Sequence, residues 1–88
     1  MQLERSEISK RIREQVVELA GRLGNDASSV SDDELLPATG LLDSAAILEL
    51  VVWYEHAFEI PLKQEEINID NLGSIDAMAD FVLMRKAG

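Results

Sequence analysis

Residues 40–58 read GLLDSAAILELVVWYEHAF, and this stretch decides the fold expected for the chain. Its apolar side chains recur every three or four positions, which is the spacing of one helix face. Five of them fall within a narrow arc of a helical wheel: Ile47, Leu50, Val51, Tyr54 and Phe58. The stretch therefore predicts a helix from Ser44 to Phe58, with Asp43 or Ser44 as its N-cap and this arc facing a core.

The side of this helix opposite the arc is expected to be exposed. It carries Ala45, Glu49, Val52 and His56, with Leu48 and Trp53 on the two flanks. Leu48 and Val52 are the candidates for a small apolar docking patch. Trp53 has two interpretations: an exposed interface anchor, or a ring packed against the long loop or the third helix.

The segments on either side of residues 40–58 also favour helices. A helix is expected from about Ser6, its N-cap, to Leu23, with five apolar residues on one face: Ile8, Ile12, Val16, Leu19 and Leu23. A long connection follows at residues 25–43. It is rich in turn formers, its leucines should pin it to the core, and residues 31–34 could form one helical turn.

The last third of the chain predicts one short helix and one long helix. The short helix should run from Lys63 to Asn68, with Ile67 and Ile69 turned inward. Ser74 should cap the final helix, whose apolar residues also recur at helical spacing. The expected fold is therefore all-α: three main helices, one short third helix and a long first loop.

Size and composition are consistent with this fold. The 88 residues make one small domain, residues 1–88, and 47% hydrophobic residues can build a core without any cysteine or metal cluster. The net charge of −9 argues against nucleic acid and anionic membranes as partners. It has two interpretations, partners with basic surfaces or solubility alone. The charged start lacks the apolar run of a signal peptide, and the longest apolar run, Leu50 to Tyr54, is too short to span a bilayer. We therefore expect the protein in the cytoplasm, as a monomer.

Ser44 is the candidate functional residue. A catalytic serine needs a base within hydrogen-bond reach, yet the only histidine, His56, lies twelve residues further along the same helix, about 18 Å away at 1.5 Å per residue. Without internal activation, Ser44 is either a simple helix cap or the substrate of another enzyme. A phosphodiester on its hydroxyl would lie at the positive end of the helix dipole, which favours an anion.

The residues around Ser44 favour modification. The stretch from Gly40 to Val51 resembles the modification motif of acyl and peptidyl carrier proteins. The similarity continues through Glu55, Phe58, Ile60 and Pro61, and into residues 65–67 and 71–75, so it covers roughly residues 36–83. Residues 43–47, Asp-Ser-Ala-Ala-Ile, are similar to stand-alone prolyl and aminoacyl carriers.

The resemblance implies a fold, a cofactor and a set of partners. The fold is the four-helix bundle of the acyl carrier type. A phosphopantetheinyl transferase would attach 4′-phosphopantetheine from coenzyme A to Ser44, with Asp43 recognised by that transferase. An adenylating ligase or acyltransferase would load an acyl or aminoacyl thioester for downstream synthases or tailoring enzymes. The second helix would dock these partners, and the candidate docking residues are Ala45, Leu48, Glu49, Val52, Trp53 and Glu55.

Two departures narrow the family assignment. Ala45 stands where the family usually has leucine or methionine directly after the serine. The docking face has Ala46, Leu48, Val52 and His56 where fatty acid carriers place acidic residues. These departures favour a dedicated carrier of polyketide or nonribosomal peptide type over a fatty acid carrier.

Two other classes of function were considered. The first is an unmodified acidic helical module that binds a basic partner. The second is an enzyme, and the chain offers it no credible catalytic set, since it has one histidine and no cysteine. Neither a catalytic residue nor a metal ligand is predicted.

Overall fold

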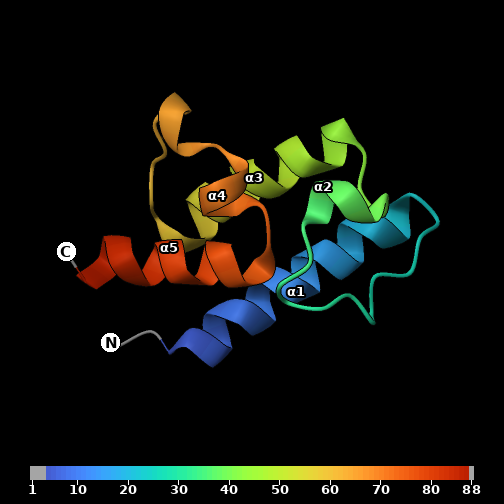
Figure 1. Ribbon diagram of the computed structural model, residues 1–88, viewed down its shortest axis with the longest axis horizontal. Coiled ribbons are helices and arrows are strands. Elements are labelled where there is room, and N and C mark those ends of the chain that lie inside the picture. Colours follow the sequence, from blue (N-terminus) through green and yellow to red (C-terminus); the bar gives the residue numbers. More distant parts are fainter. Residues whose placement is uncertain (1–3, 88) are drawn as a thin grey trace.

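The computed structural model describes residues 4–87 and is all-helical over that range, as predicted (Figure 1). Its α-helices are α1 (Arg5–Arg22), α2 (Leu36–Thr39), α3 (Ser44–Phe58), α4 (Ile69–Leu72) and α5 (Ile75–Ala87), and a 3-10 turn, η1, covers Gln64–Glu66. No strand occurs among the described residues. Met1, Gln2, Leu3 and Gly88, which belong to the predicted domain of residues 1–88, lie outside them.

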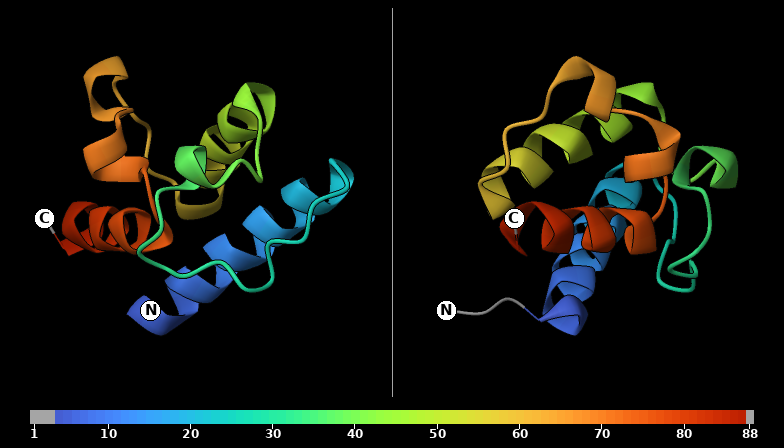
Figure 2. Two further views of the ribbon diagram at one scale, coloured as in Figure 1. Left: turned by 45° about the vertical axis from the view of Figure 1, so that its right-hand side comes forward. Right: turned by 60° about the vertical axis from the view of Figure 1, so that its left-hand side comes forward.

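The three long helices enclose one apolar core. Helix α1 packs against both α3 and α5 (Figure 2). The predicted faces of these helices supply most of the core: Ile8, Ile12, Val16 and Leu19 from α1, Leu50, Tyr54 and Phe58 from α3, and Ile75, Met78, Phe81 and Val82 from α5. Leu23 is exposed, contrary to the prediction, because α1 ends at Arg22. The predicted Ser6 cap is also wrong, since α1 begins at Arg5 with Glu4 at the N-cap.

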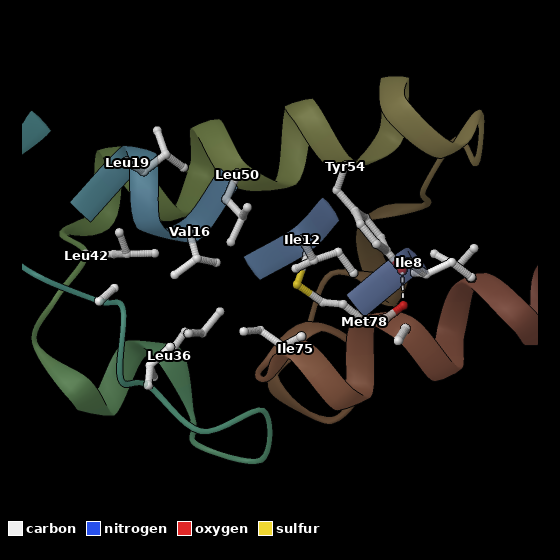
Figure 3. Packing of buried hydrophobic residues seen from close by; sticks show 14 of the residues in the cluster. Ile8, Ile12, Val16, Leu19, Leu36, Leu42, Leu50, Tyr54, Ile75 and Met78 are labelled. Carbon is white, nitrogen blue, oxygen red and sulfur yellow. Dashed lines mark hydrogen bonds between the residues drawn. The ribbon is translucent and has the colours of Figure 1, made fainter. Parts of the chain in front are cut away.

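A single buried hydrogen bond joins α3 to α5 across this core. The Tyr54 hydroxyl donates to the backbone carbonyl of Met78 at 2.7 Å, and both residues are fully buried (Figure 3). A buried hydroxyl without a partner would cost free energy, so this bond fixes where Tyr54 can lie. It therefore sets the position of α3 relative to α5.

The long connection between α1 and α3 is pinned to the core, as its leucines predicted. Ala27, Val30, Leu36 and Leu42 are buried, and the Leu36 amide donates to the Gly73 carbonyl at 2.8 Å. Residues 31–34 form a single turn, closed by a hydrogen bond from the Glu34 amide to the Ser31 carbonyl at 3.1 Å, and the helix of this connection, α2, follows at Leu36–Thr39. Pro37 in its first turn favours a helix start, and Gly40 ends it with a left-handed backbone.

The predicted third helix is wrong in its bounds and in its orientation. Residues 63–68 do not form one helix, because Asn68 caps the next turn: its side chain accepts a hydrogen bond from the Asn71 amide at 2.8 Å. The chain therefore breaks into η1 and α4. Ile67 and Ile69 are 44% and 57% exposed instead of facing the core.

The start of the last helix agrees with the prediction. The Ser74 hydroxyl accepts a hydrogen bond from the Ala77 amide at 3.1 Å, which is the bond of an N-cap. Ser74 is buried at the junction where α4, α5 and the first connection meet. The cap thus begins α5 at the point from which its apolar face reaches α1.

Candidate functional site

The candidate site is the start of α3, where Asp43 caps the helix and Ser44 presents its hydroxyl. The Asp43 backbone is extended, and its carboxylate accepts a hydrogen bond from the Ala46 amide at 2.8 Å. Asp43 is therefore the N-cap, the first of the two residues that the sequence offered for this role. Ser44 is the first helical residue and is not needed as a cap.

The Ser44 side chain is free to react with another molecule. Ser44 is exposed. Within residues 4–87, the Ser44 hydroxyl takes part in no side-chain hydrogen bond, and the bond that caps this helix joins the Ala46 amide to Asp43. His56, at the far end of α3, is too distant to serve as its base. The site can present a hydroxyl, but nothing in this geometry activates it.

The exposed side of α3 begins directly after Ser44. Ala45 is exposed, and Leu48 and Val52 are 63% and 46% exposed. These three residues lie three or four positions apart, so they share one side of the helix. They form a continuous apolar strip, and we refer to Ala45, Leu48 and Val52 as the apolar strip.

Glu49 lies beside the strip and is paired within the molecule. Its Oε2 atom accepts a hydrogen bond from Arg22 Nη1 at 2.7 Å, so a cation at the end of α1 reaches the candidate docking face. The sequence analysis missed Arg22, because no local pattern joins residues that stand 27 positions apart. Both side chains are exposed and Arg22 also lies 3.7 Å from Glu18, so the pair offsets the charge of Glu49 only in part.

Trp53 and Glu55, the other two candidate docking residues, are less exposed to solvent than the apolar strip. Trp53 is half-buried, packs against the core and meets the Phe58 ring edge-on at 5.8 Å between centroids. Glu55 is also half-buried, and its carboxylate accepts a hydrogen bond from the Leu62 amide at 3.0 Å. The aromatic partner of Trp53 thus lies on α3 itself, and the ring is neither fully exposed nor fully buried.

An open groove runs along the side of α3 that carries Ile47 and Val51. Its volume is about 190 Å³, and its apolar lining comes from α2, α3 and the segment that follows: Pro37, Ile47, Val51, Ile67, Ile69 and Leu72. Ile47, which the sequence placed on the core face, is only half-buried here. The sequence analysis missed this groove, because it expected Ile67 and Ile69 in the core.

A larger hollow than this groove lies elsewhere, along the first half of α1. It measures about 580 Å³, and its lining includes Ser9, Lys10, Arg13 and Asp32. Arg13 forms an ion pair with Asp32. The Ser9 hydroxyl is buried without a hydrogen-bond partner, and no histidine lines the hollow to act as a base. This hollow does not include Ser44.

The part of the chain that the structure describes offers neither a metal site nor a membrane-spanning helix. No group of three histidine, cysteine, aspartate or glutamate side chains is arranged there to hold a metal ion. Within residues 4–87, no helix is long and apolar enough to cross a membrane.

No protein-family model matches the chain, and searches of curated proteins and of solved structures also find no match.

Proposed function

We propose that the chain is a carrier protein that holds acyl or aminoacyl intermediates as thioesters on a 4′-phosphopantetheine arm attached to Ser44. The observation that carries this proposal is an exposed serine at the start of α3, directly after an aspartate that already caps the helix. The hydroxyl has no internal base and no structural duty, which suits a residue that another enzyme modifies.

The arrangement of the helices supports the same proposal. Three long helices, a long connection before α3 and only short turns between α3 and α5 are features that an acyl-carrier bundle would need. The backbone amides of Ser44 and Ala45 lie at the positive end of α3, where the phosphate of the arm would be stabilised. When attached, the arm supplies the terminal thiol that carries the cargo.

The docking surface that we propose is the apolar strip, with Glu49, Trp53 and Glu55 beside it. The strip itself has no charged side chain, so contacts there would be mainly apolar, with the Arg22–Glu49 pair at their edge. The partners would be a phosphopantetheinyl transferase, a ligase or acyltransferase, and synthases or tailoring enzymes. We propose a cytoplasmic pathway of polyketide or nonribosomal peptide type.

Intact-protein mass spectrometry tests the attachment. The chain is incubated with coenzyme A, Mg²⁺ and a broad-specificity phosphopantetheinyl transferase, beside Ser44→Ala and the exposed control Ser29→Ala. We expect a single addition on the wild type and on Ser29→Ala, and none on Ser44→Ala. Because Asp43 provides the cap, Ser44→Ala should stay folded, which circular dichroism checks. A wild type that is folded and unmodified would contradict the proposal.

The variant Asp43→Asn tests recognition by the transferase independently of the capping role of Asp43. The amide oxygen of asparagine can still accept the Ala46 hydrogen bond, while the negative charge is lost. We expect slower modification of this variant with unchanged helix content. A modification rate equal to that of the wild type would leave Asp43 with its capping role alone.

The exposure of Leu48 and Val52 also favours a second candidate function, an unmodified acidic module that binds a protein partner. The same serine variant distinguishes the two candidates. An interaction module keeps its binding in Ser44→Ala and accepts no arm, whereas a carrier loses its function.

A further inference from the structure

Nine consecutive residues between α3 and α5 contribute no buried side chain. We call residues 63–71 the outer segment; it contains η1 and most of α4 (orange in Figure 1). The flanking Leu62 and Leu72 are partly buried and pack against the core. The outer segment is thus anchored at its two ends and lacks the apolar burial that usually holds a segment in place.

One ion pair joins the middle of this segment to α5. Arg85 Nη1 donates to both carboxylate oxygens of Glu66, at 3.1 and 2.9 Å, and both side chains are half-buried. Arg85 Nη2 also donates to the Pro61 carbonyl at 3.2 Å, and the guanidinium lies 5.6 Å from the centre of the Phe81 ring. These contacts hold the guanidinium in one place, unlike the isolated surface pairs that contribute little.

Glu66 also organises the outer segment itself. Its carboxylate accepts a hydrogen bond from the Lys63 amide at 2.9 Å, and its carbonyl accepts one from the Asn71 side chain at 3.1 Å. A single residue therefore links η1, α4 and α5. The Lys63 amide and Arg85 both favour the ionised carboxylate, and together they lower the pKa of Glu66 below its ordinary value.

We propose that the Glu66–Arg85 pair is a latch, and that the outer segment opens as a unit when the latch breaks while the core stays folded. Ile67 and Ile69 form one wall of the groove beside α3. The latch therefore sets the shape of that groove. This inference concerns the fold of the chain and does not depend on the proposed modification of Ser44.

Residue-resolved hydrogen exchange by NMR tests the latch. The variants are Glu66→Gln, Arg85→Gln and the double variant, with Glu65→Gln as the matched control. Glu65 is an exposed neighbour and forms no ion pair within residues 4–87. In Glu66→Gln the amide oxygen can still accept the Lys63 hydrogen bond, so the variant mainly removes the charge.

We expect either single variant to speed exchange at the amides of Glu66, Ile67 and Asn71 by roughly three- to tenfold. The double variant should add little to this, since both single changes break the same pair. Glu65→Gln should leave these rates unchanged, and exchange in the cores of α1 and α3 should not move in any variant. Added salt should speed exchange of the outer segment in the wild type but not in Glu66→Gln.

Three results would overturn the latch. The first is equal exchange in Glu66→Gln, Glu65→Gln and the wild type. The second is acceleration that is uniform over the whole chain, because the pair would then stabilise the fold as a whole. The third is exchange in the wild-type outer segment at the rate of an unfolded peptide. The Glu66–Arg85 pair would then not stabilise the closed outer segment.

Discussion

At the start of α3, Asp43 caps the helix, and its neighbour Ser44 is the candidate for modification. Asp43 accepts the Ala46 amide and so begins the helix, which leaves the Ser44 hydroxyl free at the surface. Had Ser44 been the cap, its oxygen would be occupied and its replacement would weaken α3. The division is what allows Ser44 to be exchanged for alanine in a test of function without disturbing the fold.

Tyr54 leads to a prediction about alkaline pH. Burial raises the pKa of its hydroxyl far above the usual value of about 10, and the nearby charge of Arg85 only partly opposes this. A group whose pKa is higher in the folded state contributes stability below its unfolded pKa and loses it as pH rises. We therefore expect the free energy of unfolding to fall above about pH 10, as measured by urea titration.

Tyr54 is the only tyrosine in the chain, so the absorbance of tyrosinate reports its ionisation directly. Ionisation should appear only as the protein unfolds, and Tyr54→Phe should remove this part of the pH dependence. That variant should cost about 1 kcal/mol at neutral pH, since it loses the hydrogen bond to Met78. Titration of the folded protein near pH 10 would mean that the hydroxyl is accessible to water.

At the scale of elements, α3 and the outer segment differ in what determines them. The bounds of α3 agree with the prediction, because an N-cap and a repeating apolar face are local features. The outer segment breaks into two turns because Asn68 bonds to the Asn71 amide. Leu62 and Leu72 both pack against the core, and the short stretch between them runs over the surface. Its two isoleucines, Ile67 and Ile69, are therefore exposed.

The junction between α4 and α5 depends on the absence of a side chain at Gly73. A Cβ atom there would lie 2.4 Å from the Ile69 carbonyl oxygen, and the Gly73 carbonyl accepts the Leu36 amide. We expect Gly73→Ala to lower the free energy of unfolding by about 1–3 kcal/mol. Gly21→Ala is the control: nothing lies within 4 Å of its Cβ, and in α1 it should stabilise by about 0.5 kcal/mol. Urea unfolding measures both, and a neutral Gly73→Ala would contradict this account of the junction.

At the scale of the whole molecule, five of the eight lysine and arginine residues lie on α1, and three of these five form ion pairs with acidic residues. Arg5 bridges to Asp76 and Asp80 on α5, and Arg13 pairs with Asp32. Six of the 17 acidic residues have such a partner: Glu18, Asp32, Glu49, Glu66, Asp76 and Asp80. The other carboxylates give the surface its excess of negative charge.

This excess predicts that salt stabilises the protein. Raising sodium chloride from about 10 mM to about 300 mM shortens the Debye length several-fold and screens repulsion among the unpaired carboxylates. We expect the free energy of unfolding in urea to rise. Asp33→Asn, which removes an unpaired charge, should stabilise at low salt, whereas Asp76→Asn, which breaks the pair with Arg5, should not. A fall in stability with salt would mean that the ion pairs outweigh the repulsion.

The all-helical class, the bounds of α3 and the Ser74 cap could be predicted from the sequence alone, as could the choice of Asp43 and Ser44 as the candidate site. Each follows from capping or from apolar periodicity, which act between neighbours along the chain. The pairing of Arg22 with Glu49, the pairing of Arg85 with Glu66 and the groove lined by Ile67 and Ile69 depend instead on the tertiary structure. These contacts join parts of the chain that come together only when the core closes, so no local pattern could specify them.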